Sequence, residues 1–185
     1  ESWENAPYYL DGLVPLAYLL DDPSLIEKVQ KWLGWILSHQ HKNGWLGPDH
    51  DPHQPWHGYY DVWPIIILLT SITQYYEAYP QAQIIDAMIG IFKFLDTYLE
   101  KKPLRNWGRF RWGDLLLSIF WLYGQLHESW LVDLARKIQA QGYDWTNHFT
   151  NFRFTNKVKK GEEGYDFRTH GVNNEIGRAS CRERV

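Results

Sequence analysis

The chain of 185 residues repeats one unit three times, and this repeat constrains its fold more than any other feature. Each unit begins with a segment that is apolar nearly all round, at 8–20, 59–78 and 112–125. After a short polar turn comes a second segment that is apolar on one side, at 25–40, 82–100 and 130–142. Helices that are apolar all round are buried, whereas one-sided helices keep a face in water. The alternation predicts an all-α fold, either a helical solenoid or part of an α/α barrel.

An aspartate near the start of each inner segment keeps the three units in register. Asp11, Asp61 and Asp114 each follow an aromatic residue within two positions, at spacings of 50 and 53 residues. We therefore expect each of them to open an inner helix. In a helical array of this period, the short turns lie at one end and the long loops at the other. The loops expected at that second end are 1–8, 41–60, 101–113 and 143–172.

The long loops hold most of the side chains that could bind a ligand or do chemistry. Loops gathered at one end of a rigid scaffold commonly form a binding site, so we expect these side chains to converge. They are Trp3, Glu4, Trp45, His50, His53, Trp56, His57, Arg105, Trp107, Arg109, Arg111, Trp112, Trp145, His148 and His170.

The composition favours a carbohydrate as the partner. Aromatic residues make up 17% of the chain, with 11 Trp and 12 Tyr, and such rings either fill a core or stack on flat ligands such as sugars. A net charge of −3 does not favour nucleic acid, and no apolar run is long enough to span a membrane. The sequence contains no phosphate-binding loop, no nucleophile elbow and no CxxC zinc pattern.

More than one interpretation remains open for each polar candidate. The three aspartates either cap helices or bind sugar hydroxyls. The run "HDPHQPWH" at 50–57 could hold a metal, contact a ligand or simply be solvated, although Pro52 and Pro55 prevent a helix from aligning its histidines. His170 precedes the point where a fourth inner helix would begin, and is either structural or functional. The carboxylates expected at the site end are Glu4, Asp49, Asp51, Asp61 and Asp114, from which spacing alone selects no catalytic pair.

Both ends of the chain are unusual. The first residues, "ESWENAPYYLDG", start within the repeat and without Met, so we expect a fragment that lacks its natural N-terminus. The last eleven residues, "EIGRASCRERV" (175–185), resemble the translation of a common sequencing adapter and are expected not to be native. Cys181, the only cysteine, lies in that tail and carries no functional argument. The expected domain is therefore 1–174.

Several motifs resemble the β-L-arabinofuranosidases of glycoside hydrolase family 127. They are "WENAPY" at 3–8, "GWLGP" at 44–48, "WGRFRWGDLLLSIFWLYGQ" at 107–125 and "THGVN" at 169–173. The likeness covers residues 2–174 and implies an (α/α)6 barrel, of which this chain supplies about half in three helical hairpins. It also implies a pocket at the end where the long loops lie.

The resemblance implies particular roles in sugar binding. His170 in "THGVN" matches a family histidine that contacts the sugar, and Trp45 in "GWLGP" would form a wall of the pocket. At 59–63 the chain reads "YYDVW" where the family reads His-Glu-Leu-Tyr. The residues expected to bind substrate are Trp3, Glu4, Trp45, Asp61, Trp112, Asp114, His170 and Asn173. The family's zinc-bound cysteine nucleophile and acid/base glutamate are expected downstream of this chain, which itself needs no cofactor.

The expected function is that of a fragment of a retaining glycoside hydrolase that acts on terminal sugars and is inactive alone. One alternative is another α/α-barrel carbohydrate enzyme, such as an epimerase or a lyase. The other is a non-catalytic helical scaffold or sugar-binding domain. The expected partner is a carbohydrate, either an oligosaccharide or a glycoconjugate.

Overall fold

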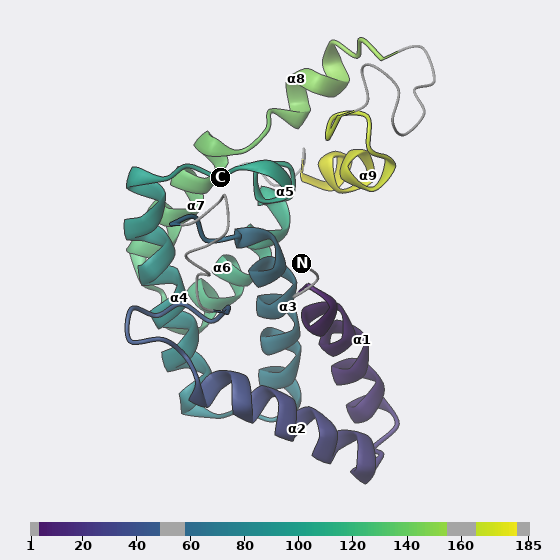
Figure 1. The fold of residues 1–185 in the computed structure, drawn as a ribbon, viewed down its shortest axis with the longest axis vertical. Coiled ribbons are helices and arrows are strands. Elements are labelled where there is room, and N and C mark those ends of the chain that lie inside the picture. The colour runs from purple at the N-terminus through teal and green to yellow at the C-terminus, as the bar shows by residue number, and fades with distance from the viewer. Residues whose placement is uncertain (1–3, 49–57, 155–165, 181–185) are drawn as a thin grey trace.

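The protein is all helical, as the repeat predicts. The computed structural model describes residues 4–48, 58–154 and 166–180, and over these ranges it contains nine helices and no strand (Figure 1). No helix within these ranges is long and apolar enough to cross a membrane.

Six long helices form three consecutive hairpins. The inner helices are α1 (Asn5–Leu19), α3 (Val62–Ala78) and α6 (Trp112–Leu126). The outer helices are α2 (Pro23–Ser38), α4 (Ala82–Lys101) and α7 (Ser129–Gln141). The bounds of these six helices agree with the six predicted segments to within about three residues, so the alternation of inner and outer helices is confirmed.

The helices begin where the sequence supplies a cap. Asp22 caps α2, since its carboxylate accepts hydrogen bonds from the backbone N–H groups of Ser24 (2.8 Å) and Leu25 (3.1 Å), and Pro23 occupies the first turn. Asp61 caps α3 by accepting from the Trp63 N–H at 3.1 Å. The first turn of α6 contains Asp114, where a negative charge complements the helix dipole.

The inner helices form one layer and the outer helices cover it. Helix α3 packs on α1 on one side and on α6 on the other, while α4 contacts both α2 and α7. Every residue of α3 from Val62 to Leu69 is buried, as expected of a helix that is apolar all round. Each outer helix keeps one face exposed to solvent. Neighbouring outer helices also contact each other: Lys137 of α7 donates to the Asp96 carboxylate of α4 at 2.5 Å.

Two predictions about the inner helices and loops were wrong. Asp11 does not open an inner helix, because α1 already begins at Asn5 and places Asp11 in its second turn. The predicted loops at 101–113 and 143–172 contain two short helices, α5 (Asn106–Phe110) and α8 (Trp145–Thr150). Both have at most six residues, too few for a periodic apolar pattern to appear in the sequence.

A helix begins directly after His170, where the sequence predicts the start of a fourth inner helix. Helix α9 (Gly171–Ser180) contacts α6. Helix α9 also contacts α8, and Figure 1 shows α8 and α9 beyond the hairpins at one end of the molecule. The helix runs into the segment expected to be non-native, which begins at Glu175, but its first turn precedes that segment.

Candidate functional site

Charged side chains gather where the inner helices begin. Glu4 directly precedes α1, Asp61 caps α3, and Arg111 directly precedes α6, whose first turn contains Asp114. The N-terminal ends of α1 and α3 lie toward the same end of the molecule in Figure 1. With Tyr8 from the first turn of α1, these residues are called the charged cluster below: Glu4, Tyr8, Asp61, Arg111 and Asp114.

The centre of the charged cluster is a buried pair of opposite charges. Arg111 is only 4% exposed, and Asp114 is partly buried. Burial raises the pKa of Asp114 to about 6, and the positive charge of Arg111 opposes that rise without cancelling it. Burial also lowers the pKa of Arg111, while Asp114 and Tyr8 act to raise it. Asp114 is therefore a carboxyl group that exchanges a proton near neutral pH.

Glu4, Tyr8 and Asp61 share the same electrostatic environment. Burial raises the pKa of the Tyr8 hydroxyl; Arg111 opposes this effect, whereas the negative charges of Glu4 and Asp114 add to it. The pKa of Asp61 is raised first by desolvation, although the residue keeps an exposed surface, and further by the charge of Glu4. Glu4 thus acts on both Asp61 and Tyr8, and Tyr8 is also influenced by Arg111 and Asp114, so the three helix starts are linked electrostatically through Tyr8 and Glu4.

Aromatic rings connect the charged cluster to His170. The guanidinium of Arg111 lies 4.7 Å from the ring centre of Trp63 and 5.8 Å from that of Trp107. Tyr8 meets the Trp63 ring edge-on at 6.0 Å, and Trp107 meets the His170 ring edge-on at 5.0 Å. The structure thus brings together Glu4, Asp61, Asp114 and His170, four of the residues predicted to bind substrate.

Asn173 lies in the first turn of α9, three residues after His170. Its side chain is fully buried, accepts a hydrogen bond from the Arg111 Nε at 2.6 Å and donates one to the Phe167 carbonyl at 2.9 Å. Both ends of the amide are occupied by protein, so the structure gives Asn173 a supporting position where the sequence predicts a sugar contact.

Trp45 and Trp112 lie in the core, although the sequence predicts that both contact substrate. Trp45 is 2% exposed, its ring packs on Tyr60 and Phe94, and its indole N–H donates to the Pro48 carbonyl. Trp112 is 6% exposed and its indole N–H donates to the Tyr143 carbonyl. A ring that stacks on a sugar needs an open face, so these positions favour packing as the role of both tryptophans.

Tyr59, in the segment that precedes α3, contacts cations. The Arg105 guanidinium lies 4.1 Å from its ring centre and the Lys102 ammonium lies 4.4 Å from it. Arg105 and Lys102 both come from the segment between α4 and α5. This segment is therefore held against the residues that precede α3.

A cavity of about 870 Å³ lies beside the charged cluster but not within it. It is bounded by Asn5, Ala6 and Tyr9 of α1, by the end of α2, and by the segment that follows α2. Glu4 and Tyr8 lie on a different face of the first turn of α1 from these residues. Among the residues that the structure describes, the cavity lining is mostly apolar and includes no carboxylate, so the charged cluster is the better candidate for chemistry on a polar ligand.

Several predicted site residues cannot be placed. Trp3, the histidines and aspartates of 49–57 and Cys181 all lie outside the described residues. Within the described ranges, no three or more His, Cys, Asp or Glu side chains are arranged to hold a metal ion. The side chains of the described residues therefore do not supply the zinc site that the resemblance implies for the family.

Tyr8 and Trp63 were not singled out from the sequence. Trp63 reads as one more apolar residue of a buried helix, and nothing in its pattern distinguishes it. Tyr8 lies four residues after Glu4 and Asp114 three residues after Arg111, spacings that place side chains together on a helix. Such pairs at two neighbouring helix starts are the signal that could have identified the charged cluster.

Comparison with known proteins identifies a family for most of the chain. The family profile described as "Beta-L-arabinofuranosidase, GH127 catalytic domain" matches residues 5–161. No curated protein and no solved structure matches the chain significantly. The match includes α1 to α8 and thus all of the charged cluster except Glu4, but it ends before His170 and Asn173.

Proposed function

Because the chain belongs to the β-L-arabinofuranosidase catalytic-domain family, glycoside hydrolase family 127, we propose that it forms the sugar-binding wall of a glycosidase pocket. The full enzyme would cleave terminal sugars with retention of configuration. The observation that carries this proposal is that Glu4, Asp61 and Asp114 lie at the starts of three inner helices, while the His170 ring packs on Trp107, whose ring lies 5.8 Å from the Arg111 guanidinium.

The chemistry of the charged cluster suits a neutral, hydroxyl-rich ligand. Ionised carboxylates accept hydrogen bonds from sugar hydroxyls, and a protonated carboxyl also donates one. With a pKa of about 6, Asp114 can do either near neutral pH. The rings of Tyr8 and Trp63 add apolar surface beside these polar groups, a combination typical of small-molecule sites.

We assign the chain binding residues and no catalytic pair. Retaining glycosidases use a nucleophile and an acid/base group placed on opposite sides of the scissile bond, about 5 Å apart. The family uses a cysteine nucleophile, and the described residues include no cysteine. We therefore expect no hydrolysis of 4-nitrophenyl β-L-arabinofuranoside by this chain alone. Turnover by the purified chain would contradict that expectation.

Binding can be measured directly with methyl β-L-arabinofuranoside by ligand-observed NMR. We expect Asp114→Ala and His170→Ala each to weaken binding roughly tenfold or more, since a hydrogen bond to a charged group contributes about 1.5–3 kcal/mol. Helical content, followed by circular dichroism, should stay near that of the parent chain.

Asp133→Ala is the matched control, because Asp133 is an exposed carboxylate on α7 that, among the described residues, pairs with Arg136 alone. It should bind the sugar as the parent does. If the parent chain does not bind any arabinoside, or if Asp114→Ala and His170→Ala leave binding unchanged, a non-catalytic scaffold becomes the better explanation. Binding of a uronate in place of the arabinoside would instead favour a lyase-like carbohydrate enzyme.

A further inference from the structure

The start of α9 is joined to the charged cluster through a single side chain. Asn173 is fully buried, and its amide oxygen accepts from Arg111 Nε at 2.6 Å while its amide nitrogen donates to the Phe167 carbonyl at 2.9 Å. An arginine only donates and a carbonyl only accepts, so the orientation of this amide is determined without ambiguity. Asn173 thus ties the residues before α9 to the residue before α6.

Arg111, which donates this hydrogen bond to Asn173, is itself held by several contacts. Its guanidinium lies 4.7 Å from the ring centre of Trp63 and 5.8 Å from that of Trp107, and its backbone N–H donates to the Trp107 carbonyl at 2.9 Å. Its carbonyl in turn accepts from the Asp114 N–H at 3.1 Å, within the first turn of α6. Backbone hydrogen bonds and two nearby tryptophan rings thus hold Arg111 in place as the hydrogen-bond partner of Asn173.

The His170 ring depends on the same turn of α9. Its Nδ1 accepts from the backbone N–H of Asn173 at 3.4 Å, in the manner of a helix cap. An accepting Nδ1 carries no proton, so the proton of the neutral ring is on Nε2. The ring also meets Trp107 edge-on at 5.0 Å, and Trp107 is one of the two rings that hold Arg111.

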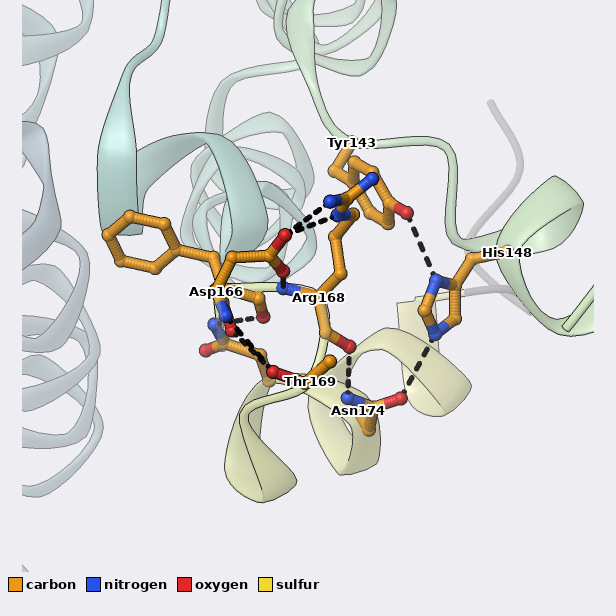
Figure 2. Close-up of polar contacts among 8 residues, drawn as sticks. Tyr143, His148, Asp166, Arg168, Thr169 and Asn174 are labelled. Atoms are coloured by element: carbon orange, nitrogen blue, oxygen red, sulfur yellow. Dashed lines mark hydrogen bonds and ion pairs between the residues drawn. The ribbon is translucent and has the colours of Figure 1, made fainter. Parts of the chain in front are cut away.

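The next residue, Asn174, also forms hydrogen bonds to the segment that precedes α9. Figure 2 shows Tyr143, His148 and Asn174 joined in a row: the Tyr143 hydroxyl lies 3.0 Å from His148 Nδ1, and His148 Nε2 lies 3.1 Å from the Asn174 amide oxygen. The Asn174 amide nitrogen donates to the carbonyls of Arg168 (2.8 Å) and His170 (2.9 Å). Two consecutive asparagines thus tie 166–170 to α6 and to α8.

We propose that Asn173 is a positioning residue that, together with Arg111, fixes the ring orientation and the tautomer of His170. This inference rests on the proposed function, in which His170 contacts the sugar. It assigns Asn173 no sugar contact, because the protein already occupies both ends of its amide. The link makes the geometry of the site depend on the docking of α9 against α6.

The test measures the His170 tautomer and sugar binding separately. Long-range ¹H–¹⁵N NMR of the imidazole distinguishes protonated from unprotonated ring nitrogens without any ligand. In the parent chain we expect His170 to hold its proton on Nε2. In Asn173→Ala the two ring nitrogens should move toward averaged shifts, and affinity for methyl β-L-arabinofuranoside should fall about tenfold.

Two further variants guard against simple unfolding. Asn173→Asp keeps an acceptor for Arg111 and should restore most of the tautomer preference and the affinity. Arg111→Lys keeps the charge but loses the Nε donor, so it should reproduce the Asn173→Ala effect. Asn151→Ala is the matched control, because this exposed residue at the end of α8 bonds to Asn147 and, within the described part of the chain, to no residue of the site; it should change neither readout.

The outcomes separate this inference from the proposed function. An unchanged tautomer in Asn173→Ala overturns the inference, whether affinity is kept or lost, and lost affinity would then point to a direct sugar contact by Asn173. An averaged tautomer in a chain whose parent binds no arabinoside supports positioning while the proposed function fails.

Discussion

At the scale of single residues, the buried carboxyl of Asp114 is the most informative. Its pKa rises to about 6 in the folded chain from an ordinary value of 3.8, mainly because burial disfavours the charged form. The folded state therefore holds this proton more tightly than the unfolded state does. The resulting contribution to stability is fully present below about pH 4 and is lost as the pH rises through about 6.

Asp114→Asn should consequently stabilise the chain at neutral pH. The amide resembles the protonated carboxyl in shape and cannot ionise, so the variant avoids a cost of up to about 3 kcal/mol above pH 6. Urea unfolding of both proteins from pH 4 to pH 8 should show curves that coincide near pH 4 and separate as the pH rises. Asp133→Asn, at an exposed position, should follow the parent throughout.

Single residues also show where sequence reasoning succeeds. Asp61 and Asp114 could be placed because each lies beside the start of a periodic apolar segment, and helix starts have recognisable chemistry. Trp45 and Trp112 could not, because residues around a loop carry no periodicity that separates buried from exposed positions. Their indole N–H groups are satisfied by the carbonyls of Pro48 and Tyr143, and the second of these lies 31 residues away in the chain.

At the scale of elements, the segment between α2 and α3 is set by a close approach to α4. Gly44 has a φ of +95°, and an added Cβ there would overlap the carbonyl of Gly90. Gln40 holds the same contact, since its amide donates to the carbonyls of Gly44 (2.8 Å) and Ala87 (2.9 Å). Only glycine suits a left-handed backbone pressed against another backbone.

Gly44→Ala should destabilise the chain by at least about 2 kcal/mol, because it combines an unfavourable φ with a backbone clash. Gly34→Ala is the control: that glycine lies within α2 with nothing near its would-be Cβ, and alanine should stabilise the helix by about 0.5–1 kcal/mol. Thermal unfolding measures both. Equal melting temperatures for the two variants would contradict the close approach of Gly44 to Gly90.

Elements were predictable in proportion to their length. The six long helices carry three or more turns of apolar pattern each, and their bounds follow from it. Helices α5 and α8 are held by tertiary contacts instead: Arg111, at the end of α5, bonds Asn173, and His148 of α8 bonds Tyr143 and Asn174. Contacts between residues so far apart in sequence leave no local signal.

At the scale of the whole molecule, the hairpins are covered unequally. Helix α3 lies between α1 and α6 and is buried along most of its length, whereas α1 has an inner neighbour on one side only. Tyr9 and Leu16 of α1, Leu20 directly after α1, and Trp32 and Trp35 of α2 are exposed, and we call them the α1–α2 apolar face. The α1 residues follow one helical stripe, and the apolar cavity lies beside Tyr9, Trp32 and Trp35.

The α1–α2 apolar face should make the isolated chain self-associate, since large exposed apolar patches favour association. Trp35 is 61% exposed, with one face stacked on His39 at 4.2 Å, and Tyr9 lies 6.1 Å from Trp32. Sedimentation velocity should show mass that increases with protein concentration. The double substitution Trp32→Glu/Trp35→Glu should reduce this association at least severalfold, because burying two carboxylates in a contact is costly.

Leu117→Glu provides the comparison, because Leu117 is 54% exposed on α6, away from the α1–α2 apolar face. It adds one negative charge without touching the face and should leave the association nearly unchanged. A monomeric parent chain at all concentrations, with a single cooperative thermal transition, would mean that the exposed tryptophans are tolerated in water. Equal relief of association by both substitutions would assign the effect to net charge instead, so the α1–α2 apolar face is responsible only if the tryptophan variant alone dissociates.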